Sequence, residues 1–362
     1  MAAPPCHVIP RQSGMLTARS IHNVTCTNSK LRTTIHTLAY PSAILDLHFS
    51  PHDKSYFSIT SSTGSVSIFT INWTQQSPAI CLHSTFQTFS VDTVVTSGVW
   101  HPVHPRLLAL TTTTGAVALI QLNETFMEHK IISEELYCHK SRFCESEAWT
   151  AAFGATSSSD ESNRYTSLYS GGDDSMLRSY IFESEDLNMT DDSLGPGGSK
   201  GIGGHGAGVV AILPLPLKTG VGEEILLTGS YDEYIRVISM RNYHDTELAT
   251  DRQDIRTELR LGGGVWRLKF LDGNQDTSPI EVSSQREWLV LASCMHAGAK
   301  VLKVKGSLAD EWTIEILAEF DEHQSMNYAS DVQRREDGSW ICVSTSFYDK
   351  LLAVWRFDQL SR

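Results

Sequence analysis

The chain has 362 residues, of which 41% are hydrophobic and 20% charged, an ordinary composition for a globular protein. Its 42 acidic and 29 basic residues give a formal charge of −13. This excess of acid argues against direct nucleic-acid binding, which needs clustered Lys and Arg. No apolar run approaches the roughly 18 residues of a membrane-spanning helix. We therefore expect neither nucleic acid nor a membrane as a partner.

The seven cysteines are odd in number, scattered and free of Cys-X-X-Cys pairs. This pattern is typical of reduced thiols in the cytoplasm, and the N-terminus lacks the apolar stretch of a secretory signal. Cys138 and His139 lie near Cys144, and His101 lies near His104, but no second pair completes a four-ligand set. We interpret these as a surface loop and a Pro-rich turn, and expect no metal and no cofactor.

Residues 1–40 contain strand-like pieces but no complete repeat, so we interpret them as an N-terminal segment that forms part of a blade. Residues 41–358 consist of short β-branched and aromatic runs separated by Gly, Asp, Ser and Pro, as in all-β chains. Six blocks share one pattern: an alternating strand, a loop, an apolar strand, a tight polar turn and a second alternating strand. The turn positions in register are Thr63, Thr114, Asp174, Asp232, Ala297 and Asp349.

These blocks match a WD-type repeat of about 40–45 residues lengthened by insertions. The turn aspartates suit the pattern because a carboxylate can accept nearby backbone N–H groups. Only the last block keeps the closing Trp, as Trp355. The predicted fold class is all-β: a WD40-type β-propeller with six clear repeats and a seventh, reduced blade at the N-terminus.

Residues 183–204 are acidic and then Gly-rich, which predicts a flexible insertion between two blades. The segment 197–201 matches the nucleophile-elbow pattern around Ser199, and 201–206 matches a Gly-rich dinucleotide loop. Both motifs need a strand-to-helix turn, which a flexible linker does not supply. We interpret both matches as chance.

Polar and aromatic side chains recur where the first strand of a block begins. They are Glu147 and Trp149 in one block, Trp266 and Arg267 in another, and Tyr328 and Asp331 in a third. The Trp residues could equally pack between blades. The charged residues favour a functional role because charges are rarely buried without a purpose, although Arg267 and Asp331 could pair with each other.

Strings in the middle blocks resemble those of the WD-repeat diphthine methyl esterases, over roughly residues 40–357. They are Ala148–Phe153, Tyr169–Asp174, Thr228–Glu233, Gly263–Arg267 and Cys294–Gly298. The resemblance implies hydrolysis of the methyl ester of methylated diphthine, on a modified histidine of translation elongation factor 2. That reaction frees the carboxylate for amidation to diphthamide.

The substrate that the resemblance implies carries a trimethylammonium group, which aromatic and acidic side chains can attract. The candidate substrate-binding residues are Glu147, Trp149, Asp173, Trp266 and Tyr328.

For the ester chemistry, our hypothesis assigns His296 as the base, with Asp331 or Asp173 supporting it and Arg267 stabilising the oxyanion. The possible nucleophiles are Ser230, Cys294 and Ser346.

The alternative is a non-catalytic interaction scaffold, since many WD propellers only bind proteins and fold alone does not settle function. Val237–Arg241 faintly echoes a string of propellers that serve as substrate receptors of ubiquitin ligases. Under either interpretation we expect a monomer that meets a protein partner. The favoured partner is elongation factor 2.

Overall fold

The computed structural model describes residues 38–72, 79–139, 146–154, 165–183, 200–202, 204–218, 223–241, 253–272, 285–307 and 311–358. These fall into two compact units, one made mainly of Thr33–Gly203 and the other mainly of Gly204–Arg362. We call them unit 1 and unit 2 and describe each by itself. The predicted partial blade of residues 1–40 lies almost wholly outside the described residues.

Unit 1 holds three antiparallel sheets of four strands. The first contains β1 (Ile44–Phe49), β2 (Tyr56–Ser61), β3 (Ser65–Asn72) and β4 (Ala79–Gln87). The second contains β5 (Val95–Trp100), β6 (Leu107–Thr112), β7 (Ala116–Leu122) and β8 (His129–Cys138). The third contains β9 (Ala148–Phe153), β10 (Tyr165–Gly172), β11 (Leu177–Glu183) and β12 (Lys200–Ile202).

Unit 2 holds three further antiparallel sheets. The first contains β13 (Val209–Lys218), β14 (Glu223–Ser230), β15 (Tyr234–Arg241) and β16 (Gln253–Arg260). The second contains β17 (Arg267–Phe270), β18 (Arg286–Ser293), β19 (Ala299–Gly306) and β20 (Thr313–Phe320). The third shows three strands within the described residues: β21 (Asn327–Arg334), β22 (Trp340–Ser346) and β23 (Leu352–Phe357).

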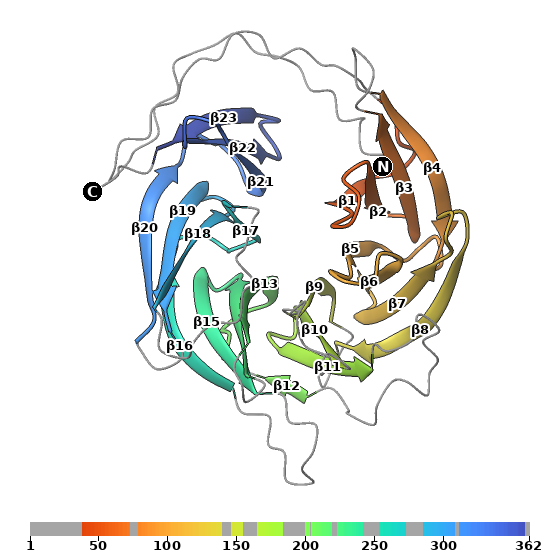
Figure 1. The fold of residues 1–362 in the computed structure, drawn as a ribbon, viewed down its shortest axis with the longest axis horizontal. Helices are drawn as coiled ribbons and strands as arrows, with labels where there is room; N and C mark the ends of the chain where they lie inside the picture. The colour runs from red at the N-terminus through yellow and green to blue at the C-terminus, as the bar shows by residue number, and fades with distance from the viewer. Residues whose placement is uncertain are drawn as a thin grey trace. The chain divides into compact units, whose positions relative to one another are not determined.

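Every sheet follows the chain, each strand pairing with the next one in sequence. Within unit 1 the first strands β1, β5 and β9 lie next to one another, and within unit 2 β17 lies between β13 and β21 (Figure 1). This is the blade arrangement of the WD repeat, and the predicted fold class, an all-β propeller of WD-type blades, is confirmed. No described residue belongs to a helix that could cross a membrane.

The apolar second and third strands of each block form the core because their side chains pack between neighbouring sheets. In unit 1, Val66 and Ile68 of β3 belong to one buried cluster with Leu108 and Leu110 of β6. Each such side chain contributes about 1.5–3 kcal/mol when it leaves water. The first strands β17 and β21 carry more polar side chains, so their starts remain available for polar functions.

Turns lie at five of the six positions predicted between second and third strands, and a bend lies at the sixth, Asp349. One segment differs from expectation. Lys200–Ile202, predicted to lie in the flexible insertion, forms β12 and pairs with the third strand of its sheet, β11. Residues 184–199, including Ser199, and residue 203 of that insertion lie outside the described residues.

Candidate functional site

Main-chain hydrogen bonds join the segments of unit 2 that carry the predicted site residues. Each segment bonds to the next, so these segments lie side by side, and we call the set the shelf: 230–231, 264–267, 293–296, 326–328 and 346–348. The bonds run from Val265 N to Ser230 O (3.0 Å), Trp266 N to Ser293 O (2.8 Å), Asn327 N to Met295 O (2.9 Å) and Phe347 N to Met326 O (3.1 Å).

Five aromatic rings follow one another along the shelf, and we call them the aromatic row. Trp266 lies 5.7 Å from Tyr231 and 5.0 Å from Tyr328, centroid to centroid. Tyr328 continues to Phe347 at 6.0 Å, and Phe347 to Tyr348 at 5.1 Å. The row ends in solvent, where Phe347 and Tyr348 are 64% and 73% exposed. The structure thus brings together two predicted substrate-binding residues and adds three that the sequence did not single out.

A glycine allows the row to close at its inner end. A Cβ on Gly264 would lie 2.6 Å from the sulfur of Met295 and 3.4 Å from the ring of Tyr231. The first distance is shorter than van der Waals contact, so a larger residue would have to displace the Met295 side chain, whereas 3.4 Å from Tyr231 is an ordinary contact. The Gly-Gly-Val-Trp string therefore has a packing reason in addition to its resemblance to a family.

The three predicted catalytic residues all belong to unit 2, but they form no triad. His296 is exposed on the turn after β18, and its ring forms no hydrogen bond with any described residue. Arg267 lies over the ring of Trp266 at 5.5 Å and donates from Nη1 to the carbonyl oxygen of that residue at 3.3 Å. Asp331 is exposed on β21 and pairs with Lys269. The alternative pairing of Asp331 with Arg267 is therefore wrong.

The remaining predicted substrate-binding residues form a small cluster in unit 1. Trp149 donates its indole N–H to Oδ1 of Asp173 at 2.8 Å, and the backbone of Asp173 donates to the carbonyl of Glu147 at 2.9 Å. Partial burial and the nearby Asp173 carboxylate raise the pKa of Glu147 above its ordinary value. An indole thus lies beside two carboxylate-bearing residues, a combination that suits a cation.

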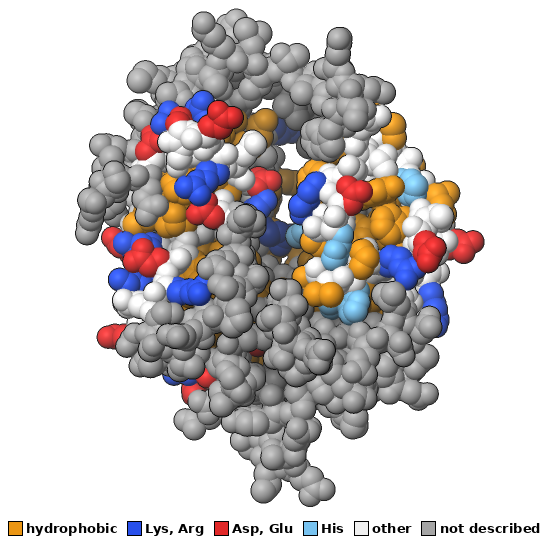
Figure 2. Space-filling view, viewed as in Figure 1, with side chains coloured by type: hydrophobic (Ala, Val, Ile, Leu, Met, Phe, Trp, Pro, Cys, Tyr) orange, Lys and Arg blue, Asp and Glu red, His pale blue; other side chains and the backbone are white. Residues whose placement is uncertain are grey.

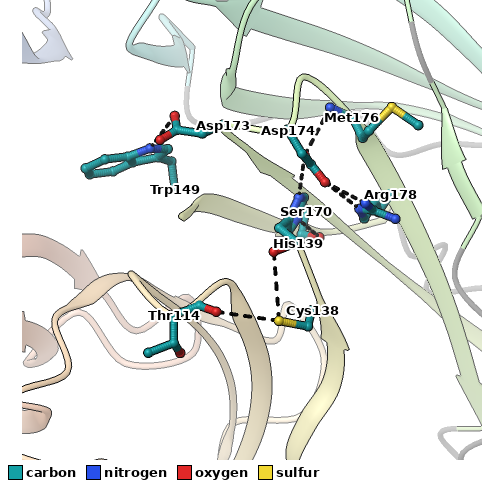
Figure 3. Close-up of polar contacts among 9 residues, drawn as sticks. All are labelled: Thr114, Cys138, His139, Trp149, Ser170, Asp173, Asp174, Met176 and Arg178. Carbon is teal, nitrogen blue, oxygen red and sulfur yellow. Dashed lines mark hydrogen bonds and ion pairs between the residues drawn. The ribbon is translucent and has the colours of Figure 1, made fainter. Parts of the chain in front are cut away.

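A Ser–His–Asp arrangement occurs in unit 1, but it is buried (Figure 3). Nε2 of His139 lies 2.9 Å from Oγ of Ser170, and Nδ1 lies 2.8 Å from Oδ1 of Asp174. The other oxygen of Asp174, Oδ2, accepts from the guanidinium of Arg178. The His139 side chain has no exposed surface and Ser170 is buried, so no ester could reach the serine oxygen. We interpret this network as a structural link between the β10–β11 turn and the preceding sheet.

The expectation that Cys138 and His139 lie in a surface loop is wrong for His139, because its imidazole is buried at the centre of that network. This block keeps only the His of the Gly-His pair in the WD signature, because Cys138 stands where the Gly would be, so the signal in the sequence was weak. The last block contains a similar buried His–Ser contact. Oγ of Ser344 lies 2.8 Å from Nε2 of His323 and accepts the indole N–H of Trp355 at 3.1 Å.

The three possible nucleophiles are buried and already engaged. Oγ of Ser230 donates to the carbonyl of Ala207 at 3.0 Å, and Oγ of Ser346 donates to Asp349. Burial raises the pKa of the Cys294 thiol to about 12, which disfavours the nucleophilic thiolate. An activated water therefore suits the shelf better than a covalent nucleophile. Within the described part of the chain, no group of three His, Cys, Asp or Glu side chains could hold a metal ion.

The string that favoured a ubiquitin-ligase receptor lies inside a sheet. Val237, Ile238 and Met240 of β15 are buried, so they present no surface to a partner. On the face shown in Figure 2, acidic and basic side chains are interspersed over each unit. On this face, attraction for a cation is therefore local, from individual rings and carboxylates.

No family model matches the chain. It is 26% identical over 345 residues to a Saccharomyces cerevisiae protein named diphthine methyltransferase, covering 86% of this chain and 83% of the relative. A Schizosaccharomyces pombe protein of the same name is 27% identical, covering 86% of this chain and 78% of the relative. A Mus musculus protein, also named diphthine methyltransferase, is 26% identical, covering 88% and 57%.

Among solved structures, Chaetomium thermophilum Sqt1 bound to the N-terminus of the ribosomal protein L10 matches with a TM-score of 0.49 and 12% identity, over 83% of this chain and 69% of that one. The similarity to the sequence relatives extends over most of this chain, so they indicate the family to which it is related. The resemblance noted in the middle blocks is confirmed, and these relatives support the assignment of the chain to the diphthamide biosynthesis family.

Proposed function

We propose that the chain acts in diphthamide biosynthesis as a carboxylic ester hydrolase in the cytoplasm. Its substrate would be the methyl ester of methylated diphthine on translation elongation factor 2. The observation that carries this proposal is the shelf of unit 2. There an exposed imidazole, a guanidinium and a row of aromatic rings occur on segments that main-chain bonds hold together.

The chemistry needs one water and no cofactor. His296 takes a proton from water as the oxygen attacks the ester carbonyl carbon, and the carbonyl electron pair moves to its oxygen. The guanidinium of Arg267 stabilises that oxyanion. When the tetrahedral intermediate collapses, the carbon–methoxy bond breaks and the imidazolium returns its proton to the leaving oxygen. The products are methanol and the free carboxylate.

The structure supports different parts of this proposal unequally. The exposure of His296 and the position of Arg267 over Trp266 support their roles. Asp331 is the weaker member, because its ion pair with Lys269 makes it a positioning residue for β17 and β21 at most. The cluster of Glu147, Trp149 and Asp173 in unit 1 is a second place where the substrate or its protein carrier could bind.

The relatives' name raises a second possibility, in which the methyl group passes to or from an acceptor other than water. The test uses elongation factor 2 that carries methyl-esterified diphthine, incubated with the purified chain in water enriched in the heavy oxygen isotope. Hydrolysis gives methanol and one heavy oxygen in the new carboxylate, both detectable by mass spectrometry.

Matched variants make the test specific to the shelf. His296→Gln should slow methanol release at least about a hundredfold. His83→Gln, at a half-buried histidine of unit 1 that contacts the carbonyl of Thr125, should leave the rate unchanged. Loss of the ester methyl without methanol, or with transfer to another molecule, would refute hydrolysis. A folded chain that leaves the ester intact would favour the scaffold interpretation.

A further inference from the structure

We propose that the outer end of the aromatic row is the site that recognises a quaternary ammonium group. This site, the ammonium corner, consists of Tyr328, Phe347, Tyr348 and Asp349. The inference deepens the proposed function, since the ammonium group would be that of the esterified substrate. Of the aromatic residues expected from the sequence to contact the cation, it keeps Tyr328 but not Trp149 or Trp266.

The rings of the corner meet nearly at right angles. Tyr328 and Phe347 are 75° apart at 6.0 Å, and Phe347 and Tyr348 are 90° apart at 5.1 Å. Perpendicular rings form the walls of a corner, so a single rounded cation can contact more than one of them. Each ring face attracts a cation through its quadrupole, and the attraction grows as water is removed from the contact. Quaternary ammonium groups suit such walls because their methyl groups also bury apolar surface.

The inner end of the row already has a cation. The guanidinium of Arg267 lies over Trp266 at 5.5 Å, so a trimethylammonium group on that ring would be repelled by a like charge. Tyr328 touches Trp266 on one side and Phe347 on the other. A compact substrate whose cation lies against Tyr328 and Phe347 would thus place its neighbouring ester group toward Arg267.

Two exposed aromatic side chains would ordinarily be mobile, yet the backbone that carries this pair is fixed. Phe347 N donates to the carbonyl of Met326 at 3.1 Å, and Tyr348 N donates to Oγ of Ser325 at 2.9 Å. The turn is therefore attached to the loop that precedes β21. Preorganisation of this kind lowers the entropy that a ligand must overcome on binding.

A carboxylate completes the corner. Asp349 follows the two rings directly, accepts from the backbone of Gln324 at 3.0 Å and also accepts from Ser346. Burial acts to raise the pKa of Asp349, but the hydrogen bonds from Ser346, Gln324 and Leu351 outweigh it and hold the pKa below its ordinary value. The group is thus negative at neutral pH, and in the sequence it follows the two most exposed rings of the row directly. Together the rings and the carboxylate favour a methylated cation over a neutral apolar ligand.

The test measures binding by the whole chain without any ester chemistry. Choline and its neutral analogue 3,3-dimethylbutanol have almost the same shape, so their difference reports the positive charge. We expect choline to bind at least about threefold more tightly than the alcohol, as followed by calorimetry or by NMR of the aromatic resonances. Phe347→Leu should weaken choline binding about three- to tenfold. Phe49→Leu, at an exposed Phe of unit 1, should leave it within about twofold.

The outcomes separate this inference from the proposed function. Equal binding of the two probes, or full choline binding by the folded Phe347→Leu variant, would overturn the ammonium corner even if the chain hydrolyses the ester. Charge-dependent binding lost in Phe347→Leu would support the corner even if no methanol is released. A rise in KM of that variant toward the esterified protein, with unchanged kcat, would support both.

Discussion

A change of pH from 7 to 5 should destabilise unit 1 through a buried imidazole. His101 is buried, its Nδ1 accepts from the backbone N–H groups of Val103 and His104 at 3.0 and 2.9 Å, and Nε2 lies 3.4 Å from Oγ1 of Thr166. Burial, followed by the nearby rings of His104 and His52, lowers the pKa of His101 to about 3 from 6.5. The folded state therefore binds fewer protons than the unfolded state between these two values.

The magnitude follows from that window. Stability is retained above pH 6.5 and is lost as the pH falls toward 3, because only the unfolded chain gains the proton. At pH 5, one and a half units below the unfolded pKa of His101, the loss is about 2 kcal/mol. Burial lowers the pKa of His205 in unit 2 to about 4, so the same sign holds there.

Urea unfolding at pH 7 and pH 5 measures this loss. His101→Asn keeps an acceptor near the position of Nδ1 but cannot take up the proton, so its loss between the two pH values should be smaller than that of the wild type by about 2 kcal/mol. His296→Asn is the control, because that ring is exposed on a turn. If the His101→Asn and wild-type chains lose the same stability, or if NMR shows His101 titrating near its ordinary pKa, the reasoning is refuted.

Three further variants test other features. Ser170→Ala should cost about 1–3 kcal/mol of stability, measured by thermal unfolding, yet leave kcat per folded molecule unchanged, whereas a collapse of kcat would identify a catalytic serine. His296→Gln should lower kcat/KM by a factor of about 10² to 10⁴ at unchanged stability, and full activity would exclude the imidazole from the mechanism. Gly298→Ala should lose more than about 3 kcal/mol, since its φ is +73° and its Cβ would lie 2.1 Å from the carbonyl of Phe320. Gly338→Ala, at φ +83° with open space around it, should lose only about 1–2 kcal/mol, and equal losses would contradict the steric account.

The fold could be predicted because its signals are local. Alternating apolar residues define each strand, and a turn residue such as Asp232 shows its role within a few positions by accepting from Tyr234 N at 3.0 Å. β12 could not be predicted, because Lys200–Ile202 has no apolar alternation and is defined only by its pairing with β11. The burial of His139 was missed for a similar reason, since its partner Asp174 comes from the next blade.

The candidate site was only partly accessible from the sequence. Trp266 and Tyr328 attract attention because aromatic residues are unexpected at the start of a first strand. Phe347 and Tyr348 follow a turn, where exposed residues are common, and only the contacts between segments show that they continue the same row. Asp331 shows the opposite case. Its charge suggests a functional role in the sequence, but in the structure the carboxylate forms an ion pair with Lys269 on the neighbouring strand β17.

The shelf separates the framework of the site from its chemistry. Its segments are joined through peptide groups, which every non-proline residue possesses, so side chains can be exchanged there without breaking the joints. Evolution or laboratory selection could therefore change the ligand preference by substituting one aromatic residue at a time, while the main-chain hydrogen bonds between the segments are kept. In such lineages, we expect substitutions at the row to outnumber insertions between its members.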